Sequence, residues 1–122
     1  MDLDTFAAHA RKVIDQLPSD LRSHLHNVTV LVEDWPSRRQ LREQGLGQPA
    51  ELFGLYEGLP LTERGADYGL VLPDRILLFR GPHLLAAEDE SSLVAELRTT
   101  VLHELAHHFG IDDERLRELG AY

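Results

Sequence analysis

Apolar residues recur at helical spacing in two long segments, one near each end of the chain. The first segment begins beside Asp2 and Asp4, either of which favours a helix start, and it stops at Pro18, which cannot continue a helix. Its apolar positions are Leu3, Phe6, Ala7, Ala10, Val13, Ile14 and Leu17. The second segment follows the acidic and capping residues 88–92 and runs to Phe109, which predicts a second amphipathic helix. Its apolar arc consists of Val94, Leu97, Val101, Leu105 and Phe109.

Three short stretches between these helices predict strands. Val28–Glu33 alternates and is rich in β-branched residues, and residues 52–56 form a shorter stretch in which Gly54 indicates a bulge or bend. Residues 75–80, RILLFR, form an apolar run between two prolines. Because their apolar side chains point both ways, a helix must cover one face, and another element or a bound peptide must cover the other.

The remaining segments are polar or rich in glycine. Ser37 followed by Gln40 has the form of a capping box and predicts a short helix through about Glu43. Residues 18–27 predict a polar connector, and residues 60–69 predict a loop with turns. No repeat or linker interrupts the chain, so we expect one domain spanning residues 1–122.

Composition narrows the class of protein. Of the 122 residues, 43% are hydrophobic and 27% are charged, as in an ordinary soluble globular domain, and no apolar run could span a membrane. The start of the chain is acidic and lacks a signal-peptide pattern, so we expect a cytoplasmic protein without a membrane partner. The net charge of −9 argues against nucleic acid as a partner, and neutral or basic peptides would bind more easily. Acidity that serves solubility is the favoured explanation of this charge, ahead of attraction of a substrate. Cysteine is absent, so a bound metal must be held by His, Asp or Glu.

The stretch HELAHHFGIDD carries the candidate chemistry. His103 and His107 are four residues apart, so on a helix they differ by about 40° around the axis and point the same way. Two imidazoles in that arrangement can hold one zinc ion. Glu104 lies about 100° from His103, so it would flank the metal and face a bound water, which suits a general base.

A turn after the second histidine can supply a third ligand. Gly110 allows the left-handed conformation in which helices often end, and the chain can then return so that Asp113 reaches the metal. Asp112 competes for this role, but it is also placed to cap a short last helix over DERLREL. We favour Asp113 as the ligand and Asp112 as the cap. His108 projects toward the apolar arc and is interpreted as a packed histidine.

Two further residues lie on the histidine side of the predicted helix. Glu96 and Thr100 precede His103 by about two turns and one turn. They are candidates for contacts that orient the histidine rings, and a polar, solvent-facing edge is an equal alternative.

The complete pattern HExxHxxGxxD, met by His103, Glu104, His107, Gly110 and Asp113, resembles the zincin superfamily. Together with LFGLYEGLPLTER, LPDRILLFRGP and the residues after the motif, it is similar to the small bacterial zincin-like metallopeptidases called Zincin_1. The similar part covers roughly residues 28–120. It implies an α+β fold of minimal size, with a small mixed sheet packed against the first helix and the long HExxH helix. It also implies zinc held by both histidines and Asp113, with Glu104 as the catalytic carboxylate. The only methionine is Met1, so no methionine-containing turn can support the metal.

These features favour a zinc metallopeptidase over two alternatives. One alternative is a non-catalytic zinc-binding or peptide-binding module with the same fold, although three protein ligands leave a fourth position for water, which favours catalysis. The other is a metal-dependent ribonuclease; its pattern, HGxxHxxGxDH, has glycine in place of Glu104, and the acidic charge is wrong for RNA.

The substrate side of the site is less defined by the sequence. The prolines beside the predicted strand from Arg75 to Arg80 are compatible with a sheet edge, where a peptide substrate could pair, and a simple buried strand is the alternative. By residue type alone, Tyr68, His83 and Tyr122 are candidates to stabilise the oxyanion.

Overall fold

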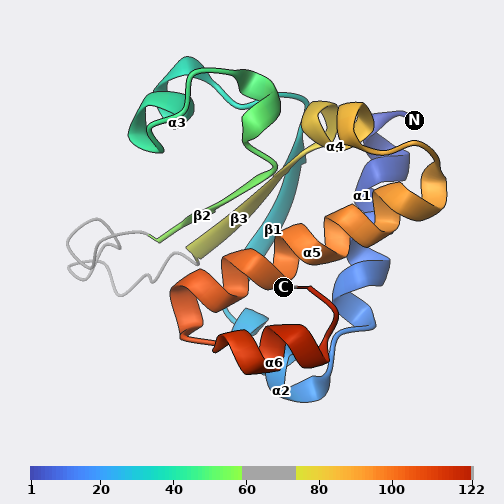
Figure 1. The fold of residues 1–122 in the computed structure, drawn as a ribbon, viewed down its shortest axis with the longest axis vertical. Helices are drawn as coiled ribbons and strands as arrows, with labels where there is room; N and C mark the ends of the chain where they lie inside the picture. The colour runs from blue at the N-terminus through green and yellow to red at the C-terminus, as the bar shows by residue number, and fades with distance from the viewer. Residues whose placement is uncertain (59–73, 122) are drawn as a thin grey trace, which may run out of the picture.

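The computed structural model describes residues 1–58 and 74–121 of the chain, and Figure 1 shows the arrangement of their elements. In chain order these are α1 (Leu3–Asp15), α2 (Ser19–Arg22), η1 (Ser23–Leu25), β1 (Val28–Glu33), α3 (Arg38–Glu43), η2 (Pro49–Glu51), β2 (Gly54–Glu57), β3 (Asp74–Phe79), α4 (Arg80–Ala86), α5 (Glu90–Phe109) and α6 (Asp113–Glu118). The predicted α+β class, with a small mixed sheet and two main helices, is confirmed. None of the described helices is long and apolar enough to cross a membrane.

The sheet has the strand order β1-β3-β2. β1 pairs with β3 in parallel from Val28 opposite Asp74 to Glu33 opposite Phe79, and β2 pairs with the other side of β3 in antiparallel register. The edge position considered for residues 75–80 is therefore wrong, because β3 is the central strand. The proline that follows it, Pro82, lies in the first turn of α4, where its missing N–H breaks no helical hydrogen bond.

Both faces of the sheet are covered, as the two-sided apolar pattern of β3 predicted. Ile76 and Leu78 join the main core formed with α1 and α5, and Figure 1 shows these two helices side by side along the sheet. Leu77 and Phe79 point to the opposite face, where they pack with side chains from α3 and the segment before β2. A second layer of the protein itself, rather than a bound peptide, thus covers that face.

Capping residues fix the ends of the helices largely where the sequence indicated. Asp2 caps α1, and Ser37 with Gln40 forms a reciprocal capping box at α3. Asp89 and Ser92 form another such pair at the start of α5. The start of the long helix was therefore correctly predicted from these polar residues, and its end from Gly110.

Three expectations about local structure were wrong. The connector 18–27 contains α2 and η1, because buried Leu21 ties this polar segment to the core. α4 was not predicted, because its seven residues are too few to show an apolar period. The strand expected at residues 52–56 begins at Gly54, and its register with β3 is continuous without a bulge. The loop predicted at residues 60–69 lies outside the described residues.

Candidate metal and catalytic site

The two candidate metal-binding histidines lie on the side of α5 that faces away from the core. Leu97, Val101 and Leu105 are fully buried, whereas His103 and His107 are exposed. At the end of the helix Gly110 has a φ of 70°, the left-handed conformation that glycine adopts without strain. The helical register predicted for the motif and the turn that follows it are both present.

Glu104 is held between the helix and the sheet. Its Oε2 accepts a hydrogen bond of 3.2 Å from the backbone N–H of Tyr56 in β2. Burial raises the pKa of this carboxyl, and the opposing effects of the Tyr56 hydrogen bond and of His107 and His103 do not cancel that rise. A carboxylate with a raised pKa is a stronger proton acceptor, which is the property that a general base requires.

The close approach of β2 to α5 depends on Gly54. A Cβ atom at this position would lie 2.7 Å from Cγ2 of Thr100 and 3.2 Å from the backbone oxygen of Leu77. Only glycine therefore fits here without a shift of the strand or the helix. Two residues further along the same strand, the Tyr56 amide comes within reach of Glu104.

His83 connects α4 to the same part of α5. This fully buried ring contacts the backbone oxygen of Phe79 through Nδ1 at 2.7 Å and Oγ1 of Thr100 through Nε2 at 2.9 Å. Burial lowers the pKa of His83, which favours the neutral ring. His83, considered as an oxyanion helper from its residue type alone, is thus a buried residue whose two ring nitrogens are both engaged within the protein. The other two candidates, Tyr68 and Tyr122, lie outside the described residues.

The three histidines of the motif have different surroundings. Nε2 of His103 is hydrogen-bonded to the backbone oxygen of Ala121, beyond α6. His108 is exposed rather than buried in the apolar arc, and its ring stacks on Tyr56 with centroids 4.0 Å apart. His107 meets His108 edge to face at 4.9 Å.

The two aspartates after the turn differ in role. Oδ1 of Asp112 accepts a hydrogen bond of 2.9 Å from the N–H of Arg115, so Asp112 caps α6 as expected. Asp113 is the exposed first residue of that helix. Among residues 1–58 and 74–121, no three His, Asp or Glu side chains come close enough together to hold a metal ion. The structure therefore does not bring Asp113 into a three-ligand group with His103 and His107.

The donor set nevertheless suits zinc in part. Two exposed imidazoles one helical turn apart can hold one ion, and the half-buried carboxylate beside them has the type and position of a catalytic base. His103 can use Nε2 for a metal only if the Ala121 carbonyl gives up its hydrogen bond. The residues thus fit zinc at two positions, and the third donor is not in place.

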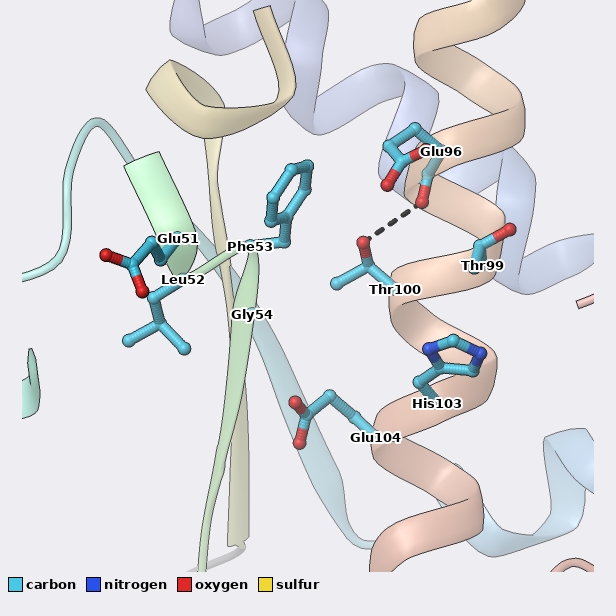
Figure 2. A pocket seen from close by; sticks show the side chains of 9 residues that line it. All are labelled: Glu51, Leu52, Phe53, Gly54, Glu96, Thr99, Thr100, His103 and Glu104. Carbon is cyan, nitrogen blue, oxygen red and sulfur yellow. Dashed lines mark hydrogen bonds between the residues drawn. The ribbon is translucent and has the colours of Figure 1, made fainter. Parts of the chain in front are cut away.

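A cavity of about 260 Å³ opens beside Glu104 and His103 (Figure 2). The residues that line it are Glu51, Leu52, Phe53, Gly54, Glu96, Thr99, Thr100, His103 and Glu104. Figure 2 shows Glu51 and Leu52 on one side of the cavity and the helical residues on the other. Glu96 and Thr100 were expected near the histidine rings, but Thr100 bonds His83 and the backbone of Glu96 instead. No sequence signal indicated that residues 51–53 line this cavity, because only the tertiary fold brings them to α5.

Comparisons with known proteins agree with this fold. The family model described as zincin-like metallopeptidase matches residues 25–121. A solved structure, a conserved hypothetical protein from Thermo thermophilus, is similar with a TM-score of 0.54 and 24% identity, over 89% of this chain and 94% of that one. No curated protein matches the chain. The family match covers most of the chain and includes the whole HExxHxxGxxD motif, so this chain belongs to the zincin-like metallopeptidase family.

Proposed function

We propose that this protein is a zinc-dependent metallopeptidase in which Glu104 is the general base. His103, His107 and Asp113 would hold the metal. The observation that carries the proposal is the position of Glu104, half-buried between two exposed helical histidines and hydrogen-bonded to the β2 backbone. A carboxylate fixed in this way, with a raised pKa, has the orientation and basicity that proton transfer needs.

The chain's own groups account for the proton transfers of peptide hydrolysis. Zinc, when bound, would supply Lewis-acid chemistry that acidifies water and polarises a carbonyl. Glu104 would take a proton from the attacking water and deliver it to the leaving amine. The tail carbonyl of Ala121 would release His103 for metal binding.

The side of β2 that does not pair with β3 is the proposed place for the substrate backbone. Among the described strands β2 pairs only with β3, and the Tyr56 amide on its other side points to Glu104. An extended peptide could add to this side by main-chain hydrogen bonds, which would place its backbone beside the carboxylate. β2 therefore replaces the central strand β3 as the pairing strand.

A second function is a zinc-binding or peptide-binding module without catalysis. Two observations favour it: the Nε2 of His103 is engaged by Ala121, and no three donors are grouped within residues 1–58 and 74–121. In this alternative the motif would bind a metal or a peptide and leave it unchanged.

The substitution Glu104→Gln separates the two functions. The variant should keep stoichiometric zinc and lose about 100-fold or more in kcat, because general-base catalysis contributes roughly 10²–10⁴-fold. Zinc content by elemental analysis and cleavage of a broad peptide library measure the two properties. Glutamine can still accept the Tyr56 N–H, and it removes a carboxylate charge that burial disfavours, so the metal-free variant should unfold at no lower temperature than wild type.

Glu88→Gln is the matched control, because it removes the same charge from an exposed position before α5 and should keep full activity. Wild-type protein that contains zinc but cleaves no library peptide would favour the binding module. A Glu104→Gln variant with undiminished turnover would exclude Glu104 as the base.

A further inference from the structure

Aromatic and imidazole rings form a row across the end of α5. His24 stacks on Phe109 with centroids 4.7 Å apart, and Phe109 meets Tyr56 edge to face at 5.7 Å. Tyr56 stacks in turn on His108 at 4.0 Å, and His107 meets His108 edge to face at 4.9 Å. The exposed residue His108 is therefore fixed in place by a ring from β2 on one side and by a candidate metal ligand on the other.

His108 lies on the same side of α5 as Glu104. The two residues are four positions apart, so they differ by about 40° around the helix axis and lie one turn apart along it. Tyr56 contacts both of them, because its amide donates to Oε2 of Glu104 and its ring stacks on His108. His108 and the candidate base thus face the same part of β2, beside the proposed place of the substrate backbone.

The ring nitrogens of His108 are not used within the protein as far as it is described. Both nitrogens of His83 are engaged, and Nε2 of His103 is bonded to the Ala121 carbonyl. By contrast, neither nitrogen of His108 forms a hydrogen bond or an ion pair within residues 1–58 and 74–121. An imidazole carries at least one N–H donor in either of its protonation states. A ring that packing already orients can donate to an external acceptor with little further loss of conformational freedom.

We propose that His108 contacts the substrate by donating a hydrogen bond to a backbone carbonyl of an extended peptide that lies along β2 beside Glu104. A backbone carbonyl is the expected acceptor, because an extended peptide presents one at every residue. The contact therefore positions the peptide relative to the carboxylate without selecting a particular side chain. This inference rests on the proposed peptidase function and names a substrate-binding residue for it.

Peptide binding to the metal-free protein tests the contact without relying on turnover. The probe is an acetylated and amidated heptapeptide of alternating valine and lysine, in which valine favours the extended conformation. NMR titration should show shifts at the amides of β2. His108→Phe keeps a ring that can stack on Tyr56 but has no N–H, so it should bind the probe about two- to ten-fold more weakly than wild type, as expected for the loss of one hydrogen bond.

Two further variants separate the hydrogen bond from the packing of the rings. His24→Phe makes the same replacement at the other end of the row, where the ring also stacks on an aromatic residue, and it should bind like wild type. His108→Gln retains an N–H donor and should recover part of the affinity that His108→Phe loses. Both phenylalanine variants should unfold near the wild-type temperature, because each replaces an exposed ring by another ring. An equal loss of binding in His24→Phe would mean that ring packing alone acts, and it would overturn the proposal.

The remaining outcomes also decide the matter. Undiminished binding by His108→Phe, no binding of the probe by wild type, or shifts confined to residues away from β2 would each refute the contact. Hydrolysis by the zinc-loaded protein is scored separately. Turnover with an unchanged KM in His108→Phe refutes the contact alone, whereas binding that depends on His108 in a protein without turnover refutes the peptidase and leaves a peptide-binding site.

Discussion

The two sides of the candidate site differ in how they are fixed. On the β2 side, Glu104 bonds the Tyr56 amide, Gly54 lets the strand touch Thr100, and buried His83 ties Thr100 to α4. On the α6 side, Asp113 is exposed and groups with no two other metal-binding side chains among the described residues. The candidate catalytic carboxylate, Glu104, is thus positioned by the core, whereas the third candidate ligand, Asp113, is not.

The difference shows which parts of a metal motif can form without the metal. Spacing along a helix places His103, Glu104 and His107 because the backbone hydrogen bonds of α5 hold their register. A ligand beyond the helix needs a defined path of the chain, and here that path depends on an exposed turn and a six-residue helix. Metal binding would supply the free energy to order such a ligand.

The largest expected effect comes from Asp113→Ala. Loss of a metal ligand should lower zinc affinity by at least about 100-fold, since even partners that only orient ligands are worth roughly 10–100-fold. Competition with a chelating dye measures the affinity. The unfolding midpoint of the metal-free protein should stay near that of wild type, because the Asp113 side chain is exposed.

Asp112→Ala is the control for that prediction. It removes the cap of α6 and should lower the unfolding midpoint of the metal-free protein while changing zinc affinity little. If Asp112→Ala lost zinc and Asp113→Ala kept it, the assignment of cap and ligand would be reversed.

Gly54→Ala should disturb the close packing of β2 against α5, which is the side of the site that holds Glu104. The added methyl would lie 2.7 Å from Thr100 Cγ2, and the resulting strain should reduce the free energy of unfolding by about 1–3 kcal/mol. Urea unfolding of the metal-free protein measures this change. Gly47→Ala introduces the same methyl where no atom lies within 4 Å, so it should have little effect. Equal stability of the two variants would contradict the proposed role of close packing.

The smallest effect is a pH dependence from His83. Its pKa in the folded protein lies below the ordinary value of 6.5 because burial disfavours the charged ring. The unfolded chain therefore binds more protons as the pH falls through about 6.5, so the free energy of unfolding should decrease there. Urea unfolding between pH 5 and 8 should show a shallower decrease for His83→Asn than for wild type. The exposed control His26→Asn should keep the wild-type slope, and identical slopes for all three proteins would exclude this effect.

Local sequence patterns predicted much of the fold. Apolar periodicity located α1, α5, β1 and β3, and polar caps such as Asp89 located helix ends. The order of the strands in the sheet could not be predicted from the sequence, because the prolines beside residues 75–80 are compatible with both an edge strand and a central strand. At the site, the helical register of the motif was predictable, as was the cap at Asp112. The Tyr56 amide, buried His83 and the cavity wall at Glu51 join α5 from distant segments, so no local spacing could indicate them.

The same turns of α5 carry both the core and the candidate chemistry, which constrains how the chain can change in length. Leu102 and Leu105 are fully buried, and His103 and Glu104 stand between them. One residue inserted earlier in the helix would rotate everything beyond it by about 100°, turning the histidines away from their present side and leucines out of the core. We therefore expect insertions to be tolerated only in the connections outside α5. The twenty residues between Asp89 and Gly110 must keep their number, because that number sets which side chains face the core and which face the candidate site.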